Sequence, residues 1–545
     1  MSIDKIKLLN KKNNAKSAKN TLATKSFDEE LFNERLHKHY DELKWLYCEL
    51  YQNNSKALAF FETLVQELKE YAVDRADYLN SLDETRASET KWYSHKNFVA
   101  MQMYPELFAG DFKSFAKRFA YLAESNVNHL HLLAVFEQND VATINKKLGS
   151  LEDLCIFLER CHEENISVCL DYSLASVSSE DEPIVFNDIA KNILTLANYG
   201  ADMIALNNLP KNHNVVRMIR MICEIVCPTV ALLGKVNTST EDKLSYIGSK
   251  DKGQCHLIYN DELSAQLWHT LATGDAGLLK HKIDELENNV KDKDVVYQNS
   301  VRSLEGIKWN LDYGFLKSQG TDELLHKDYL NNFYEGKFEG SFALGKLCQC
   351  EDKHICGTSA SLCGIEYFDK QKDKDRASIL QAIDCEVLLH SVLFSLSGMA
   401  VVASGDEIAQ YNNERISLKQ ENAHELNQAV FNWRKAGRRN IKNGIQAGVY
   451  QRMLQMENIR FKYEVFNTNA KVYTLATWDK SVLAIVRETP MEKFIGLYNF
   501  SAEEHTAWID EKDGVYTDLL TSRNDITASG IVCSPYQTIW LWHKK

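Results

Sequence analysis

The sequence predicts an α/β protein: a parallel (β/α)8 barrel preceded by an α-helical segment and followed by an antiparallel β-sandwich. Three observations support this prediction. From residue 92 to about 460, eight short apolar runs alternate with amphipathic stretches, as in a barrel of parallel strands joined by helices. The residues before this region carry apolar side chains at helical spacing. Those after it form short β-like runs separated by turn residues.

The N-terminal part of the chain divides into a tail and a helical domain. Residues 1–25 contain seven lysines, one acidic residue and few apolar side chains, which predicts a flexible basic tail, with an electrostatic tether to an acidic partner as the alternative. Residues 26–91 are predicted to be helical, because apolar side chains recur every three or four positions. The first stripe consists of Phe32, Leu36, Tyr40, Leu43, Tyr47 and Leu50, and the second of Phe60, Leu64 and Leu68.

The predicted barrel covers residues 92–462. Its candidate strands are residues 97–103, 129–133, 167–173, 203–207, 230–236, 256–259, 295–301 and 399–403. Helices are expected between them, one over 112–122 and one opened by a capping box of Ser150 and Asp153. The long interval 309–381 must contain additional elements before the last strand. Residues 463–545 are predicted to form the sandwich, with strands at 472–475, 482–486, 494–499, 514–520 and 538–543.

The composition excludes several classes of protein. The net charge of −13 argues against general binding of nucleic acids, which requires a basic face. No apolar run approaches the roughly 20 residues of a membrane span, and the N-terminus lacks the apolar core of a signal peptide. The 13 cysteines are scattered through a long chain, which favours reduced thiols and a cytoplasmic protein over a disulfide scaffold.

Several phrases of the sequence resemble those of amylosucrases, bacterial members of the α-amylase family of glycoside hydrolases. They are LFAGDFKSF (107–115), HLHLL (129–133), LGSLEDL (148–154), VFNDIAKNILTLANYGADMI (185–204), LWHTLAT (267–273), FEGSFALG (338–345), CGTSASLCG (356–364) and ASGDEIAQ (403–410). The resemblance implies a TIM barrel and a retaining mechanism. In that mechanism one carboxylate attacks the sugar and a second carboxyl group protonates the leaving oxygen.

The residues that the resemblance assigns to catalysis are replaced in this chain. The nucleophilic aspartate after the fourth strand corresponds to Asn207, and the arginine two residues before it corresponds to Ala205. The acid after the fifth strand corresponds to Lys235. Of the histidine and acid expected after the seventh strand, the histidine is Leu304 and only Glu305 keeps a carboxylate.

Other features of the sugar pocket are also missing. Ala175 and Ser176 stand in place of an asparagine–histidine pair, and the glycine-rich loop after the second strand is absent. The domain normally inserted after the third strand is reduced to about a dozen residues. Asn432 replaces an arginine before Trp433.

These replacements predict a catalytically inactive amylosucrase-like protein. An amide cannot attack carbon as an anion, and a charged lysine opposes an oxocarbenium-like transition state. The protein is therefore expected to act by binding, as a regulatory or scaffold subunit, with a protein partner or a second copy of itself. Candidate ligands are α-glucan and sucrose.

Two alternatives remain open. One is an active retaining glycosidase or glucosyltransferase of the amylosucrase type, with a rearranged carboxylate set drawn from Glu305, Asp406 and Glu407. The other is a structural, self-assembling protein.

Further residues are candidates for binding. Arg302, Trp309, Asp406, Glu407 and Trp433 are assigned to substrate contacts. Buried packing is the alternative for the tryptophans, Trp268 included, and helix capping for the two acids. Asn207 and Lys235 are otherwise expected to be polar filler at the barrel mouth, with Lys235 paired to Glu305. Cys348, Cys350, His354 and Cys356 have the residue types of a zinc site but lack paired C-x2-C spacing, so incidental cysteines are favoured. No cofactor is expected.

Overall fold

The computed structural model describes residues 26–89, 91–178, 180–236, 240–293, 295–349, 353–414, 420–511 and 514–545. The predicted basic tail, residues 1–25, lies outside these ranges. The chain divides into two compact units. The first contains the described residues up to 93 together with 104–259, and the second contains 94–103 together with 260–545. The predicted boundaries between a helical domain, a barrel and a sandwich stay predictions.

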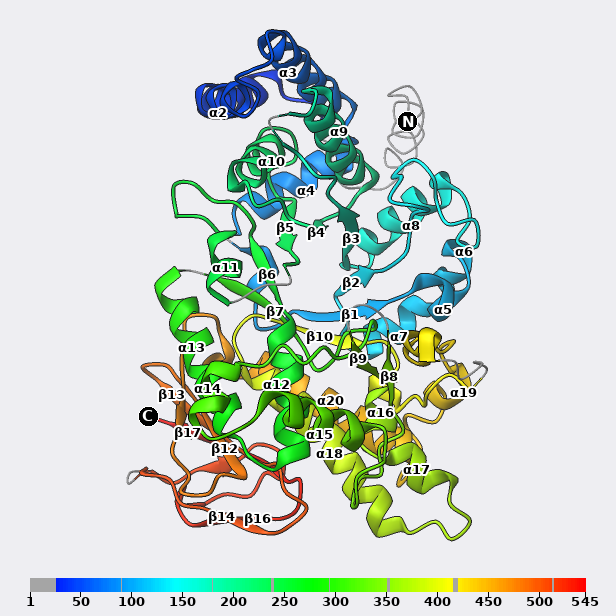
Figure 1. Cartoon of the computed structure of the whole chain (residues 1–545), viewed down its shortest axis with the longest axis vertical. Coiled ribbons are helices and arrows are strands. Elements are labelled where there is room, and N and C mark those ends of the chain that lie inside the picture. The colour runs from blue at the N-terminus through cyan, green and yellow to red at the C-terminus, as the bar shows by residue number, and fades with distance from the viewer. Residues whose placement is uncertain are drawn as a thin grey trace. The chain divides into compact units, whose positions relative to one another are not determined.

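The predicted barrel is confirmed. Eight parallel strands follow one another in the closed order β1-β10-β7-β6-β5-β4-β3-β2 (Figure 1). Their bounds are β1 Val99–Met103, β2 His129–Leu132, β3 Ser167–Ser173, β4 Met203–Asn207, β5 Ala231–Gly234, β6 Leu257–Asn260, β7 Val296–Ser300 and β10 Met399–Ala403. Each lies within two residues of its predicted start and end. Most strand residues are buried, as expected for a sheet covered on both faces.

In the first unit, helices cover the strands β2 to β6. They are α2 Glu29–Leu50, α3 Ala57–Asp74, α4 Asp77–Ala87, α5 Pro105–Ala109, α6 Phe112–Phe115, α7 Phe119–Glu124, α8 Leu151–Glu163, α9 Ile184–Tyr199, α10 His213–Val226 and α11 Thr240–Ser245. The capping box of Ser150 and Asp153 is present at the start of α8. The single helix predicted over 112–122 is wrong, because a 3-10 turn, Ala116–Arg118, separates α6 from α7.

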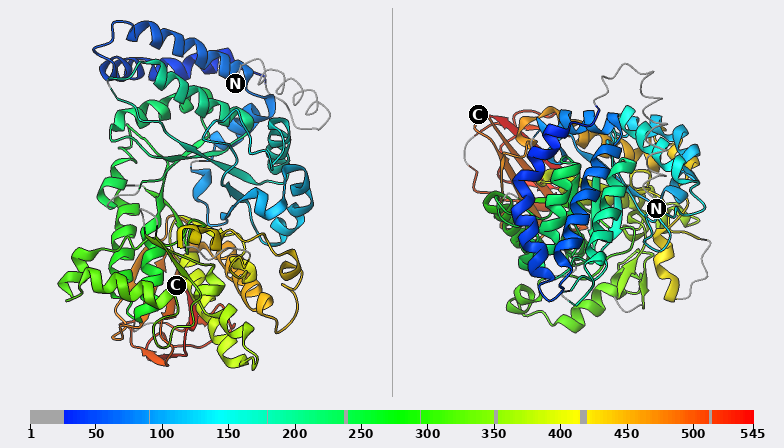
Figure 2. Two further views of the ribbon diagram at one scale, coloured as in Figure 1. Left: turned by 45° about the vertical axis from the view of Figure 1, so that its right-hand side comes forward. Right: turned by 90° about the horizontal axis from the view of Figure 1, so that it is seen from above.

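The N-terminal helices α2 and α3 pack against the barrel helices α9 and α10. Figure 2 shows the blue pair lying alongside the green pair in its right-hand view. The buried Tyr47 hydroxyl of α2 donates to Asn187 Oδ1 of α9 at 2.8 Å, and Asn187 Nδ2 donates to the Phe60 carbonyl of α3 at 3.0 Å. The apolar stripes predicted from the sequence face this contact, since Phe32, Leu43, Tyr47 and Leu50 are all buried.

In the second unit, the long interval before the last barrel strand contains short helices and one hairpin. These elements are α14 Tyr313–Ser318, α15 Glu323–Tyr334, β8 Lys346–Cys348, β9 His354–Cys356, α16 Ser359–Leu362 and α17 Ile365–Lys370, followed by the longer helix α18 Arg376–Ser395. Helices α12 Asp261–Thr273 and α13 Gly277–Lys293 lie before β7, and α19 Trp433–Ala436 and α20 Ile445–Lys462 follow β10. Helix α18 has the length and apolarity of a membrane-spanning helix, but 67% of its most apolar window is buried inside the protein. This burial is typical of a helix in the core of a folded protein.

The C-terminal part forms antiparallel sheets, orange to red in Figure 1. A five-stranded sheet has the order β11-β12-β13-β17-β15, and a second sheet pairs β14 with β16. The bounds are β11 Lys471–Leu475, β12 Val482–Glu488, β13 Glu492–Asn499, β14 His505–Ala507, β15 Thr517–Asp518, β16 Ile531–Cys533 and β17 Thr538–Lys544. The strand predicted over 514–520 is only two residues long. The prediction also missed β14 and β16, which are too short to show alternation in the sequence.

Candidate functional site

In the first unit, the ends of neighbouring strands bring three side chains to one edge of the barrel. Ser173 at the end of β3 lies opposite Asn207 at the end of β4, and Lys235 directly follows β5. Because parallel strands end at the same edge, this edge corresponds to the catalytic face of (β/α)8 enzymes. The structure thus places Asn207 and Lys235 where the resemblance predicts them.

The charged centre of this edge is Asp171 on β3, which the sequence analysis did not select. One carboxylate oxygen lies 2.6 Å from His131 Nε2 of β2, and the other accepts a hydrogen bond from Lys235 Nζ at 3.0 Å. Both Asp171 and Lys235 are mostly buried, with side chains 23% and 16% exposed. Burial raises the pKa of Asp171, but Lys235 and His131 outweigh it and hold that pKa well below its usual value. The carboxylate is therefore ionised and neutralised by its own neighbours.

Lys235 thus pairs with Asp171, whereas the sequence suggested Glu305 as its partner. Its ammonium also lies 5.8 Å from the centre of the Tyr259 ring. The neighbouring Asn208 adopts a left-handed conformation (φ 55°) and donates to Ser173 Oγ at 2.7 Å, which ties the ends of β3 and β4 together.

A groove of about 850 Å³ opens beside these strand ends, within the first unit. Its lining comes from the β3–α9 and β4–α10 loops and from the end of α2: Leu46, Glu49, Leu50, Gln52, Leu174, Ser176, Val177, Ser178, Asn208, Leu209, Pro210, Lys211, Asn212 and Asn214. Its volume lies within the range of about 300–1,000 Å³ that is usual for small-molecule sites. Six of these side chains are amides or hydroxyls, which can both donate and accept hydrogen bonds and so can bind a polyhydroxyl ligand; six others are apolar, and Glu49 and Lys211 are charged. The β3–α9 loop thus forms one side of this groove.

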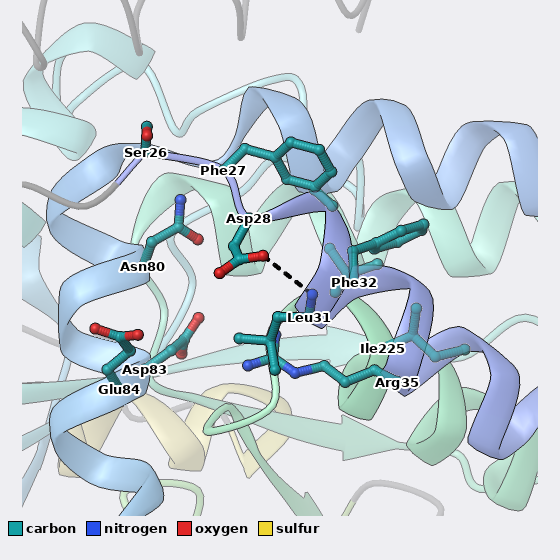
Figure 3. A pocket seen from close by; sticks show the side chains of 12 residues that line it. Ser26, Phe27, Asp28, Leu31, Phe32, Arg35, Asn80, Asp83, Glu84 and Ile225 are labelled. Atoms are coloured by element: carbon teal, nitrogen blue, oxygen red, sulfur yellow. Dashed lines mark hydrogen bonds between the residues drawn. The ribbon is translucent and has the colours of Figure 1, made fainter.

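A second cavity of about 40 Å³ lies among the helices of the same unit (Figure 3). Arg35 points into it beside Asp83 and Glu84, while Asp28 accepts a hydrogen bond from the Leu31 amide at its edge. Asp83 is engaged by Arg75 at 2.8 Å and by the Thr229 hydroxyl at 2.6 Å. A cavity of this volume has room for only a few water molecules, so it is too small for a sugar.

In the second unit, Arg302 and Asp406 contact each other. Arg302 Nε and Nη2 donate to Asp406 Oδ1 at 3.0 and 2.7 Å, and Ser359 Oγ donates to Asp406 Oδ2 at 2.9 Å. Both charged side chains are 1% exposed. The structure thus gives them structural partners, and their assignment to substrate contacts stays a prediction.

Two ionisable residues of α18, also not selected from the sequence, lie next to this pair. Glu386 and His390 are completely buried, and neither Glu386 carboxylate oxygen has a hydrogen-bond partner among the described residues. Burial, reinforced by the negative charge of Asp406, raises the pKa of Glu386 well above its usual value. Burial also lowers the pKa of His390, although Asp406 opposes this shift. Both shifts favour the uncharged form of the side chain. The two residues lie one turn apart in the mostly apolar second half of α18, a signal that sequence analysis could have noticed.

The remaining candidates are spread over the second unit. Glu305 is exposed, and its backbone amide donates to Ser303 Oγ at 3.0 Å. Trp309 is buried, donates to Asn331 Oδ1 at 2.8 Å and stacks on Tyr334, an arrangement that fits the packing alternative. Glu407 is buried and accepts the Gly405 amide at 2.8 Å. Trp433 is partly exposed, with its ring 4.5 Å from that of Phe431.

The cysteine-rich cluster lies on the β8–β9 hairpin. Cys348 pairs with His354 across the hairpin, and Cys348 and Cys356 are buried with Ala423 and Leu426. Cys350 lies outside the described residues. Across the residues that are described, no three or more His, Cys, Asp or Glu side chains are grouped to hold a metal ion.

Comparisons with known proteins agree with this architecture. No family model matches the chain. Glucosylglycerate phosphorylase of Escherichia coli K12 is 20% identical over 341 residues, which cover 61% of this chain and 56% of that protein. The chain thus matches only about half the length of this curated relative.

Solved structures with the same fold include carbohydrate complexes. A variant of AmyP in complex with maltotriose has a TM-score of 0.59 at 12% identity, covering 82% of this chain and 97% of that one. The α-amylase of Geobacillus thermoleovorans in complex with acarbose has a TM-score of 0.57 at 11% identity, covering 84% and 100%. At these identities the likeness concerns the fold alone. The chain has the (β/α)8 barrel fold seen in α-amylases, with antiparallel C-terminal sheets.

Proposed function

We propose that this chain is a catalytically inactive, amylosucrase-like protein of the α-amylase family that acts by binding carbohydrate, as a regulatory or scaffold subunit. The observation that carries the proposal is the ion pair between Lys235 and Asp171 beside Asn207. The strand end that should present a nucleophilic carboxylate presents an amide. The strand end that should present a general acid presents a lysine.

The chemistry of the pair opposes glycosidic cleavage. Asn207 has no anionic form to attack the anomeric carbon. Asp171 is a carboxylate, but Lys235 and His131 occupy its oxygens at 3.0 and 2.6 Å. A lysine whose ammonium is paired with a carboxylate is also a poor proton donor to a leaving oxygen. Loss of general acid catalysis alone costs about 10²–10⁴-fold in rate.

The alternative of an active enzyme has weaker support in the second unit. Asp406 accepts hydrogen bonds from Arg302 and Ser359, and the buried Glu407 accepts one from the Gly405 amide. Glu305 is the exposed carboxylate of this set. A retaining mechanism needs two carboxyl groups about 5 Å apart, so Glu305 would have to find a partner.

The groove beside Asn207 is the proposed binding site. Its amide and hydroxyl side chains can match the hydroxyl groups of a glucosyl unit, and the glucosylglycerate phosphorylase relative and the sugar-bound barrels motivate a glucosyl ligand. The proposed protein partner is an active glucan- or sucrose-metabolising enzyme or a second copy of the chain, in the cytoplasm. The described cysteines are free thiols, as expected for such a compartment.

The test is turnover under the conditions of both possible reactions. The purified full chain is incubated with sucrose, and separately with glucosylglycerate plus phosphate, while released fructose, glucose and glucose 1-phosphate are measured. We expect no release above a protein-free blank. Turnover that Glu305→Gln abolishes would overturn the proposal in favour of the active enzyme.

Binding is measured in parallel by calorimetric titration with sucrose and maltooligosaccharides. Ser176→Trp should fill the groove and remove any binding there. If neither sugar binds, concentration-dependent light scattering would indicate the structural, self-assembling alternative instead.

A further inference from the structure

The turn between β11 and β12 presents an exposed tryptophan in a strained conformation. Trp478 is 84% exposed, and its φ angle of 59° lies in the left-handed region. A bulky residue is an outlier there, because its Cβ crowds the following carbonyl. Exposure of an indole and backbone strain both reduce stability, and strain of this kind is concentrated at functional sites.

The exposure of Trp478 does not result from a loose turn. Thr477 Oγ1 donates to the Val482 carbonyl at 2.7 Å, and the Ser481 amide donates to Asp479 Oδ1 at 2.8 Å. The other oxygen of Asp479 lies 2.7 Å from His505 Nδ1 of β14. These bonds hold the backbone of the turn in a defined conformation, from which the Trp478 side chain extends into solvent.

A second exposed tryptophan, Trp508, is joined to this turn by a backbone hydrogen bond. The Trp508 amide donates to the Thr477 carbonyl at 3.0 Å, and the Trp508 side chain is 58% exposed. The β14–β16 register, with Ala507 opposite Ile531, places Trp508 opposite Gly530. A Cβ at position 530 would lie 3.0 Å from the indole, so one part of the ring rests on the glycine.

We propose that Trp478 and Trp508 form a platform on the C-terminal sheets that binds α-glucan chains, separate from the groove beside Asn207. The apolar face of a pyranose ring can stack on each indole, because indoles combine a flat apolar surface with a polar edge. The exposed Lys480 and the partly exposed His505 supply polar groups near these indoles. This inference rests on the proposed carbohydrate-binding function, which supplies the glucan as the ligand.

The surroundings of the two indoles favour a sugar over a protein. Next to Trp478 the chain has the partly exposed Asp479 and the exposed Lys480, so charged side chains adjoin this indole. Protein interfaces instead have a contiguous apolar core inside a polar rim.

The test is native electrophoresis of the full chain in gels with and without glycogen. We expect glycogen to retard the unchanged protein, and Trp478→Ala to weaken the apparent affinity by at least about tenfold, as for a central aromatic contact. Trp45→Ala is the matched control, because Trp45 is also an exposed tryptophan (60%) but lies on α2. It should be retarded like the unchanged protein.

Two further variants separate binding from folding. Trp478→Phe keeps a flat aromatic ring and should restore most of the retardation. Trp478→Gly removes the backbone strain, so it should raise the thermal unfolding temperature while losing the retardation. Trp508→Ala should also lose retardation, although it uncovers Gly530 and is interpreted only if its unfolding temperature is unchanged.

The proposal is overturned if glycogen does not retard the unchanged protein, or if Trp478→Ala is retarded equally. Retardation lost only in Ser176→Trp would place the glucan in the groove instead, and the proposed function would stand. Conversely, turnover of sucrose with normal retardation would refute the inactive protein but not the platform.

Discussion

The ion pair between Lys235 and Asp171 can be tested by substituting Lys235→Met. The substitution keeps an unbranched side chain of similar length and removes the charge. It leaves the Asp171 carboxylate, 23% exposed, with His131 Nε2 at 2.6 Å as its remaining neighbour in this group. We expect the variant to fold and to be less stable at neutral pH.

The expected loss follows from the geometry of the pair. Two unit charges 3.0 Å apart attract by about 5 kcal/mol at an effective dielectric constant of about 20, as a gross value before desolvation. Removing one partner of a fully buried pair costs about 3–5 kcal/mol. Because both side chains keep some exposure and His131 remains, we expect a loss of about 2–3 kcal/mol in the free energy of unfolding.

The pH dependence of this loss has a definite sign. The pKa of Asp171 is lowered in the folded state relative to about 3.9 in the unfolded chain. Its stabilising contribution is therefore complete above the unfolded pKa and is lost as the pH falls through the folded pKa. The difference between the variant and the unchanged protein should be constant from pH 6 to 8 and shrink below about pH 4.

Urea unfolding followed by fluorescence and by circular dichroism measures the loss, provided that the two transitions coincide. Lys211→Met is the control, because Lys211 is an exposed lysine of the adjacent groove. A double-mutant cycle with Asp171→Asn isolates the interaction energy. If Lys235→Met is within about 0.5 kcal/mol of the unchanged protein at pH 7, or if the two substitutions are additive, the assigned ion pair is refuted.

Three further outcomes can be measured by thermal or urea unfolding. Gly398→Ala should cost more than about 2 kcal/mol, because the added Cβ would lie 2.4 Å from the Tyr297 carbonyl oxygen at φ 97°; unchanged stability would contradict this geometry. Glu386→Gln should stabilise the protein at pH 8 but not at pH 4. Because the pKa of Glu386 is higher in the folded than in the unfolded protein, this residue lowers the free energy of unfolding once the pH rises above its pKa in the unfolded chain. If Glu386→Gln changed the free energy of unfolding equally at pH 8 and pH 4, that result would argue against a buried neutral acid. Trp478→Gly should be about 1 kcal/mol more stable than Trp478→Ala, since only glycine is unstrained at φ 59°, and equal stability would exclude strain at this turn.

Most of the fold could be predicted from the sequence. The eight barrel strands are apolar runs bounded by turns, and their positions follow from that local pattern. The stripes of α2 and α3 and the capping box at Ser150 are equally local features. The short strands β14 and β16 were missed because they have three residues each, too few to show a period, and they depend on their pairing with each other.

Only part of the candidate site could be predicted from the sequence. The sequence and its family resemblance pointed to Asn207 and Lys235, and the structure places both at the strand ends. The sequence did not indicate Asp171 or His131, because their contacts depend on the short distances between side chains on different strands. It assigned Arg302 and Asp406 to a ligand, whereas the structure pairs them with each other.

The sequence by itself determined the barrel, the helices and the amide at position 207, because periodicity and residue chemistry are properties of the chain alone. Only the tertiary structure decided which charge neutralises which. Residues 131, 171 and 235 are up to 104 positions apart, and their contacts exist because parallel strands bring their ends to one edge. The same holds for Trp478 and Trp508, which become neighbours through a single backbone hydrogen bond between distant segments.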